Sequence, residues 1–198
     1  MYTATTFNIP FIDYSFGIRF SISKGLNASL LIVKTPKAKT LGITSYCKDS
    51  KHVLFFDFDG MNLKEINYEL NRLQDYYKLS DIYLFENDKL KSFHAICLDK
   101  FDIYTAISMI RQTSADRGFK NAPLRYALRK WVLRCSEKGK RNKPKHLFTL
   151  KTNNNEYEKS NPHRIFLQMN YGIKIRKKGF DNYKELDCFE YYTASKTE

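Results

Sequence analysis

Glycine and proline are scarce in this chain, with 8 and 5 among 198 residues, which excludes a collagen-like or linker-dominated protein. Long hydrophobic runs are absent too: no apolar stretch approaches the roughly 20 residues that a membrane-spanning helix needs. Core-forming residues are plentiful, since 42% of the residues are hydrophobic and 15% are aromatic. Disorder as the main state is therefore excluded, and the length suits one domain.

Cysteine is also rare. The four cysteines lie 38 to 53 residues apart, without a Cys-x-x-Cys pair or a Cys-His pair at zinc-ligand spacing. We expect reduced, mostly buried thiols, and a zinc finger is excluded. The N-terminal stretch MYTATTFNIPF lacks the basic flank and apolar segment of a secretory signal. The expected location is intracellular, in the cytoplasm, with no membrane partner.

Positive charge is in excess and is clustered. The chain has 34 Lys and Arg against 21 Asp and Glu, a net charge of +13. Between Lys120 and Lys151 there are eleven basic residues and one acid, Glu137. Such a block attracts phosphates and favours a nucleic acid or nucleotide partner. The alternative is a basic face that is merely solvated.

Hydrophobic periodicity predicts strands and helices along the whole chain. The predicted strands cover residues 17–23, 28–34, 52–58, 81–85, 92–98, 131–135 and 146–150. The predicted helices cover residues 62–78, 101–113 and 183–192, with a short continuation at 124–128. Loops are predicted at 35–50 and 152–162, an extended segment at 165–175, and a basic turn at 136–145 that joins two paired strands.

The order strand, helix, hairpin, helix, hairpin predicts an α+β fold. We expect an antiparallel or mixed sheet with helices on one face, not a doubly wound parallel sheet. One domain is expected over residues 1–198. Its parts would be N-terminal strands in 1–50, a core in 51–151 and a C-terminal extension in 152–198.

Two aspartates end the most hydrophobic predicted strand. Side chains alternate across a strand, so Asp57 and Asp59 point the same way while Phe58 packs on the other face. Two adjacent carboxylates at the end of an apolar strand repel each other and lose hydration, and a divalent metal relieves both costs. The alternative is a strand that simply runs into an Asp-Gly turn.

A histidine lies in a second apolar strand, residues 92–98 (SFHAICL). His94 follows the Asp-x-Asp strand by one helix and one strand of a hairpin, so the two strands can be sheet neighbours. Ser92 is on the same face of its strand, and Lys91 stands at the same rim. In that arrangement His94 could donate to a metal-bound triphosphate, although a lone strand histidine is more often a packing residue.

Asp-x-Asp on a strand, then a helix, then small-x-His on a later strand resembles the first two motifs of the archaeo-eukaryotic primase superfamily. Residues 54–59 (LFFDFD) match the first motif, and residues 92–94 (SFH) match the second. Ala115 and Asp116 match the third, a small or hydrophobic residue before an acid. Leu133-Arg134 and the basic turn are similar to an arginine-bearing strand that many members carry. The resemblance covers roughly residues 50–150.

This resemblance implies a metal-dependent, template-directed nucleotidyltransferase, a DNA primase or DNA polymerase, on an RRM-like catalytic sheet. It implies a two-metal site for Mg²⁺ or Mn²⁺ held by Asp57, Asp59 and Asp116. The residues implied to contact the incoming NTP or dNTP are Ser92, His94, Lys91 and Arg134. Those implied to contact a single-stranded DNA template are Lys138, Lys140, Arg141, Lys143 and Lys145.

The same resemblance places the protein in DNA replication, of a plasmid, virus or mobile element. The chain has no P-loop (GxxxxGK[ST]), so any helicase would be a separate chain. A helicase or another replication protein is therefore a candidate partner.

Two other functions explain parts of the pattern. Residues 55–61 (FFDFDGM) are similar to the haloacid-dehalogenase signature, with Asp57 as phosphoryl-accepting nucleophile and Asp59 as general acid. No late Asp pair follows, however, and Met61 replaces the usual Thr. The other function is a non-catalytic module that binds single-stranded nucleic acid, using some of the 14 Tyr and 15 Phe for stacking. That module would need exposed aromatics on the central strands.

Overall fold

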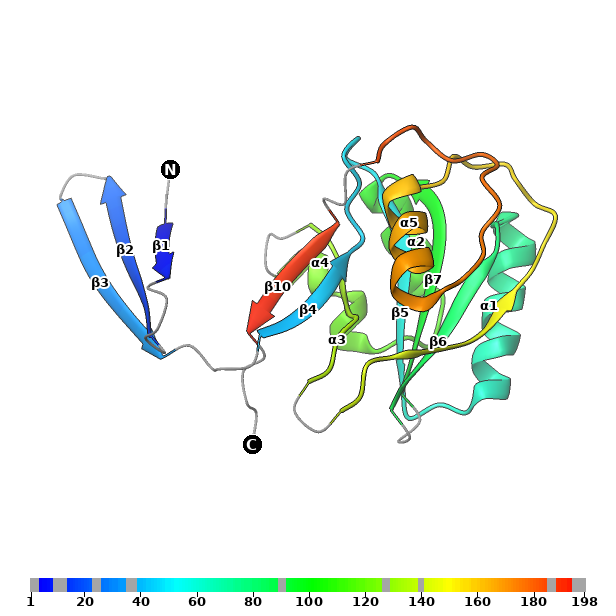
Figure 1. The fold of residues 1–198 in the computed structure, drawn as a ribbon, viewed down its shortest axis with the longest axis horizontal. Helices are drawn as coiled ribbons and strands as arrows, with labels where there is room; N and C mark the ends of the chain where they lie inside the picture. Colours follow the sequence, from blue (N-terminus) through cyan, green and yellow to red (C-terminus); the bar gives the residue numbers. More distant parts are fainter. Residues whose placement is uncertain are drawn as a thin grey trace. The chain divides into compact units, whose positions relative to one another are not determined.

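The computed structural model describes residues 4–8, 14–22, 26–34, 39–88, 92–125, 129–138, 141–184 and 188–193. The chain divides into two compact units, Met1–Lys39 with Tyr192–Glu198, and Thr40–Tyr191. In the first unit, β1 (Ala4–Asn8), β2 (Tyr14–Ile22) and β3 (Leu26–Lys34) form an antiparallel sheet in that order (Figure 1). Strands were predicted at β2 and β3, but β1 was not.

A four-stranded antiparallel sheet organises the larger unit. Its strands are β5 (His52–Asp59), β7 (Ser92–Phe101), β6 (Ile82–Asp88) and β9 (Lys145–Leu150), in this spatial order. The α+β class predicted from the sequence is confirmed. The run 52–58 does form a strand buried on both faces, since residues 53–56 and Phe58 are all 0% exposed.

A second sheet contains β10 (Phe189–Thr193), β4 (Lys39–Thr44) and β8 (Val132–Arg134) in that order. We predicted that the strands on either side of the basic turn would pair with each other. Instead β8 pairs with β4, whereas β9 pairs with β6. The connection between them is long enough to cross from one sheet to the other. Trp131, just before β8, is fully buried.

Helices α1 (Leu63–Tyr77) and α2 (Ile103–Arg111) form where the periodicity predicted them. The Asn62 side chain accepts the N–H of Glu65, and the Glu65 side chain accepts the N–H of Asn62, which together form a capping box. Asp102 caps α2 with its side chain, whose Oδ1 accepts the N–H groups of Tyr104 and Thr105. Two short helices follow, α3 (Arg117–Lys120) and α4 (Ala122–Arg125).

The fifth helix, α5 (Asn161–Tyr171), corrects two predictions. Residues 165–175 were expected to be extended, but residues 165–171 belong to this helix, which has Pro162 in its first turn and ends at Gly172, with φ +68°. Two side chains of α5 pack on the sheet: the ring centroid of His163 lies 6.0 Å from that of Phe55, and the ring centroid of Tyr171 lies 4.6 Å from that of Phe85. α5 lies on one face of the sheet, and α1 and α2 lie on the other (Figure 1). The prediction that helices cover only one face is therefore wrong.

The C-terminal end differs from expectation as well. The helix predicted over 183–192 is wrong where it overlaps β10, because the aromatic residues there suit a strand, which joins β4 in the second sheet. Residues 185–187 lie outside the described part. Similarly, the predicted loop at 35–50 contains β4, with 35–38 outside the described residues.

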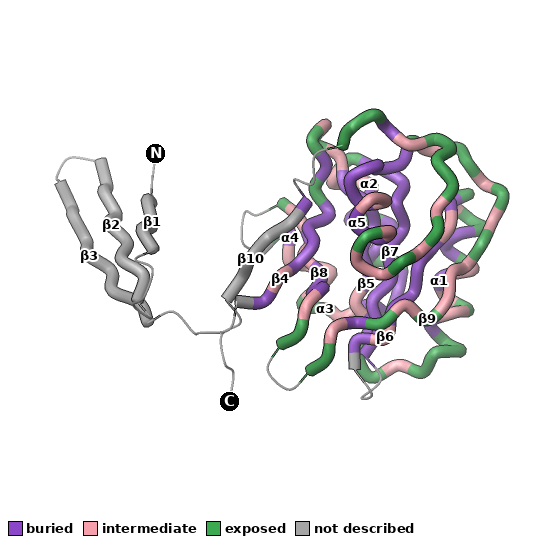
Figure 2. The backbone as a smooth tube through the Cα atoms, viewed as in Figure 1, coloured by how far each residue is buried: buried purple, intermediate pink, exposed green. Residues whose placement is uncertain are grey.

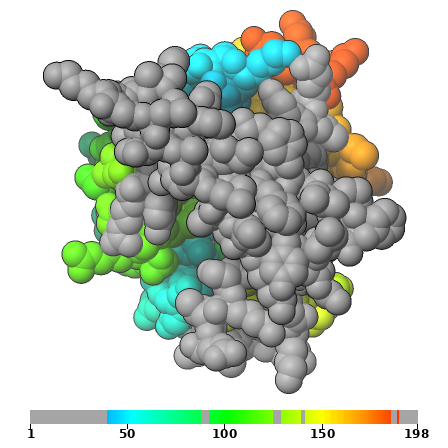
Figure 3. All heavy atoms as spheres, turned by 90° about the vertical axis from the view of Figure 1, so that its left-hand side faces the viewer, coloured from blue at the N-terminus to red at the C-terminus, as the bar shows by residue number. Residues whose placement is uncertain are grey.

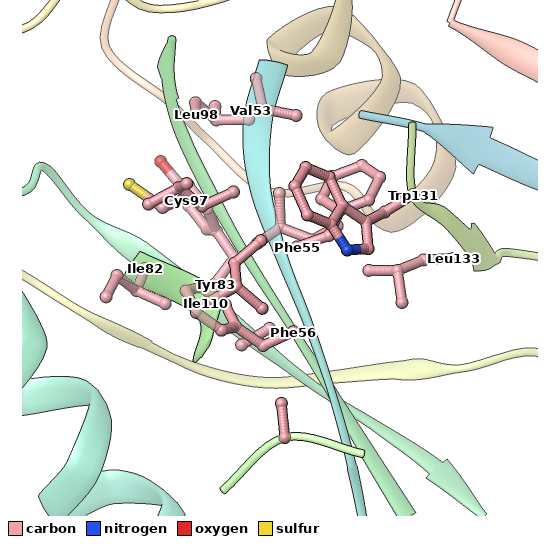
Figure 4. Packing of buried hydrophobic residues seen from close by; sticks show 14 of the residues in the cluster. Val53, Phe55, Phe56, Ile82, Tyr83, Cys97, Leu98, Ile110, Trp131 and Leu133 are labelled. Carbon is pink, nitrogen blue, oxygen red and sulfur yellow. The ribbon is translucent and has the colours of Figure 1, made fainter. Parts of the chain in front are cut away.

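Buried residues are concentrated between the sheet and its helices (Figure 2), and their side chains interdigitate around β5 (Figure 4). The four cysteines are free and buried, as predicted. Lys100 lies 2.8–2.9 Å from Asp49, Glu158 and Asp181, and so ties distant segments together. In the space-filling view, the segment just after residue 40 (blue to cyan) lies beside that near residue 180 (orange) (Figure 3).

Candidate functional site

The ends of β5 and β7 bring four predicted site residues to one face of the sheet. Asp57 lies directly opposite His94, and Asp59 lies opposite Ser92. Paired residues of antiparallel strands share a face, so all four side chains belong to the same face. The prediction that these two strands are sheet neighbours is confirmed.

The Asp57 carboxyl group is the most unusual group of this site. Its side chain is only 25% exposed, and its buried Oδ1 has no hydrogen-bond partner among the described residues. Burial, together with the carboxylates of Asp59 and Asp116, raises its pKa to about 7, against the opposing charges of Arg134 and Arg141. Near neutral pH the group is therefore divided between its acid and carboxylate forms.

His94 stands beside Asp57 without forming an ion pair with it. Its Nε2 lies 3.5 Å from Asp57 Oδ1, and the side chain is 6% exposed. Burial, assisted by the charge of Arg134, lowers the pKa of His94 to about 3. The imidazole is thus neutral at physiological pH, and the positive charge that would neutralise Asp57 has to come from elsewhere.

The third acid, Asp116, is held next to β5 by its backbone. Its N–H donates to the carbonyl oxygen of Asp57 at 2.7 Å, and its Oδ1 accepts the Phe119 N–H at 2.7 Å as the cap of α3. A Cβ on Gly118 would lie 3.0 Å from that Oδ1, so a larger residue at this position would crowd the Asp116 carboxylate. The structure therefore brings together all three acids predicted from the sequence.

Arg134 is buried and anchored. Its guanidinium donates to the carbonyl oxygens of Ser136, Asn142 and Asn87, and also to the Asn87 side chain. Asn87 in turn donates to Ser92 Oγ at 3.1 Å. These bonds join β8 to the β6–β7 hairpin beside Asp57. Asn87 and Gly118 were missed by the sequence reasoning, because neither belongs to a recognisable motif.

The basic turn is only partly directed at this site. Arg141 is exposed, and its charge acts on Asp57. Lys143 Nζ instead donates to the carbonyl and side-chain oxygens of Asn170 at 2.7 and 2.6 Å, at the end of α5. Lys138 and Lys145 are exposed. Lys91 and Lys140 lie outside the described residues.

Among the residues that the structure describes, no three His, Cys, Asp or Glu side chains form a group that could hold a metal ion unaided. A cation would therefore need oxygens from its substrate as well. Mg²⁺ is commonly held by one or two carboxylates together with substrate phosphates and water. Asp57, with its unpartnered Oδ1, and Asp59 fit that requirement.

No protein-family model, no curated protein and no solved structure matches the chain. In the described part of the chain there is also no helix of the length and apolarity needed to cross a membrane.

Proposed function

We propose that this protein is a metal-dependent, template-directed nucleotidyltransferase of the primase-polymerase type. The observation that carries the proposal is the buried, unpartnered Oδ1 of Asp57, in a carboxyl group that also feels the charges of Asp59 and Asp116. Retaining three acids here costs stability unless a cation binds to them. A basic surround beside an acidic site is the arrangement that polyphosphate chemistry requires.

Each residue has a distinct task in this proposal. When bound, divalent cations would lower the pKa of the attacking 3′-hydroxyl and neutralise the leaving pyrophosphate. Asp57 and Asp59 hold them, with Asp116 completing the negative field. Neutral His94 has one ring N–H with which to donate to a phosphate oxygen. Anchored Arg134 contributes a fixed positive charge.

The order of the elements supports the same proposal. Along the chain β5, α1, β6, β7 and α2 follow one another, and β7 lies between β5 and β6 in the sheet. The order β5, β7, β6 agrees with three strands of the RRM-like sheet that the primase resemblance implies, whereas the fourth strand, β9, lies beside β6 and leaves β5 at the edge. These elements include the residues of the first two motifs, and Ala115 and Asp116 of the third follow shortly after α2.

The rival functions receive less support. The dehalogenase reading expects a parallel α/β sheet, but the strands next to β5 and β7 are antiparallel. The stacking module expects exposed aromatics, but Phe55, Phe56 and Phe58 on β5 are fully buried. Neither function accounts for the third acid beside Asp57.

The test is primer synthesis and primer extension on single-stranded DNA with Mg²⁺ or Mn²⁺, using NTPs and dNTPs in separate reactions. Wild type should form product, and an Asp57→Ala/Asp59→Ala variant should lose at least a hundredfold in rate. Asp75→Ala is the matched control, because Asp75 is an exposed acid on α1. Equal product from all three proteins, or none from wild type with either metal, would overturn the proposal.

A further inference from the structure

A second concave surface lies in the larger unit, away from Asp57. It is a hollow of about 670 Å³ between the start of β6, the end of β9 with the segment that follows it, and residues 173–180. We name it the basic cleft. None of the residues that line it belongs to the Asp57 site.

The cleft is lined by five basic residues and a single acid. The acid, Asp81, accepts the Thr152 N–H at 3.0 Å. Lys159 is 8% exposed, and its amino group donates to the side chain of Asn155. The other four basic residues form no ion pair within the described part of the chain: Lys151, Lys174, Arg176 and Lys178. Uncompensated charge in a concavity concentrates anions there.

The rim of the cleft is built by fixed contacts. Gly179 has φ +75°, and a Cβ there would lie 2.7 Å from Asn155 Oδ1, so only glycine allows the two loops to approach. The Lys159 N–H donates to the Gly179 carbonyl at 2.8 Å. Asn154 Nδ2 donates to the Leu79 carbonyl at 3.3 Å. These contacts fix the backbone of the segments that bear the basic residues, so the cleft exists before a ligand binds.

The pattern in residues 173–176 indicates the shape of the ligand. Ile173 and Ile175 are half-buried and pack against the core, whereas Lys174 and Arg176 are exposed. Such alternation is typical of an extended segment, in which alternate residues lie about 7 Å apart, so that Lys174 and Arg176 make a row of cations suited to an evenly charged chain. Amide and hydroxyl groups of Thr149, Thr152 and residues 153–155 also line the cleft and can donate to phosphate and sugar oxygens.

We propose that the basic cleft binds the backbone of single-stranded nucleic acid, as a site separate from the Asp57 centre. A positively charged groove that follows the backbone is how such strands are held without sequence preference. Binding here needs no metal and no chemistry at Asp57. The inference therefore stands even if the protein does not transfer nucleotides.

The test is fluorescence anisotropy of a labelled 12-nucleotide oligo-dT in EDTA, across a series of salt concentrations. Lys174→Ala/Arg176→Ala should weaken binding at least tenfold and reduce the slope of log affinity against log salt by about 1.4, at about 0.7 per phosphate contact. Lys64→Ala/Arg72→Ala is the control, because it removes the same charge from exposed positions on α1 and should change affinity less than twofold.

Three results would overturn the inference: an equal loss in both double variants, no loss in the cleft variant, or thymidine monophosphate binding as tightly as the 12-mer. Hydrogen exchange gives a second readout, in which residues 173–180 should become protected when oligo-dT is added. The Asp57→Ala/Asp59→Ala variant should bind the oligonucleotide as wild type does. Failure of the proposed catalysis can thereby be told from failure of the cleft.

Discussion

Replacing Asp57 with asparagine should stabilise the protein at neutral and alkaline pH. The folded-state pKa of this carboxyl group is raised from 3.8 to about 7, so the folded protein holds a proton that the unfolded chain releases. As the pH rises from about 3.8 to about 7, the free energy of unfolding of the wild type falls, and the full loss is reached above pH 7. Asparagine cannot ionise and avoids that cost.

The size of the effect follows from the pKa difference. About 1.4 kcal/mol per pH unit gives a cost of about 4 kcal/mol at pH 8 and about 1.7 kcal/mol at pH 5. The advantage of Asp57→Asn over wild type should therefore grow by about 2.5 kcal/mol between these pH values. At roughly 2–4 °C per kcal/mol, that is roughly 5–10 °C in Tm.

The assay is chemical and thermal unfolding of both proteins from pH 5 to pH 8 in EDTA, with Asp75→Asn as control. Asp75 is exposed on α1, so its variant should follow wild type at every pH. An Asp57→Asn variant that is less stable than wild type by the same amount at both ends of the range would refute the reasoning. So would a pH-dependent gain of equal size in Asp75→Asn.

Three further predictions concern the neighbours of Asp57. Arg134→Ala should cost at least about 3 kcal/mol in denaturant unfolding, because buried carbonyl oxygens lose their charged donor; a loss below 1 kcal/mol would contradict this. The ring of His94, with its pKa of about 3, should show no NMR titration above pH 5, and a midpoint near 6.5 would disprove its neutrality. Gly118→Ala should displace the capping carboxylate of Asp116 and lower Tm by roughly 2–4 °C, for a cap worth about 1 kcal/mol. An unchanged Tm would show that the contact is not tight.

The parts of the fold that could be predicted were those with strong local signals. The apolar run of β5 and the capping box at Asn62 specify their elements without outside help. The juxtaposition of Asp57 and His94 was also accessible, since one helix and a hairpin between two strands leave few ways to pair them.

The missed parts depend on distant partners. In α5, β-branched and aromatic residues suggested an extended segment, but packing on Phe55 and Phe85 outweighs that preference. The local signals, Pro162 and Gly172, were present and were undervalued. Asn87 anchors Arg134 from 47 positions away, and no sequence motif links the two residues, so this contact could not be predicted.

The central claim is that Asp57 binds a cation together with a nucleotide, and calorimetry tests it most directly. Preformed Mn²⁺–dATP would be titrated into wild type and Asp57→Asn at pH 7, in two buffers of different ionisation enthalpy. Wild type should bind and release about half a proton, because a group of pKa about 7 must deprotonate fully. Asp57→Asn should bind at least tenfold more weakly and release none. Equal affinity and equal proton release in the two proteins would contradict the account.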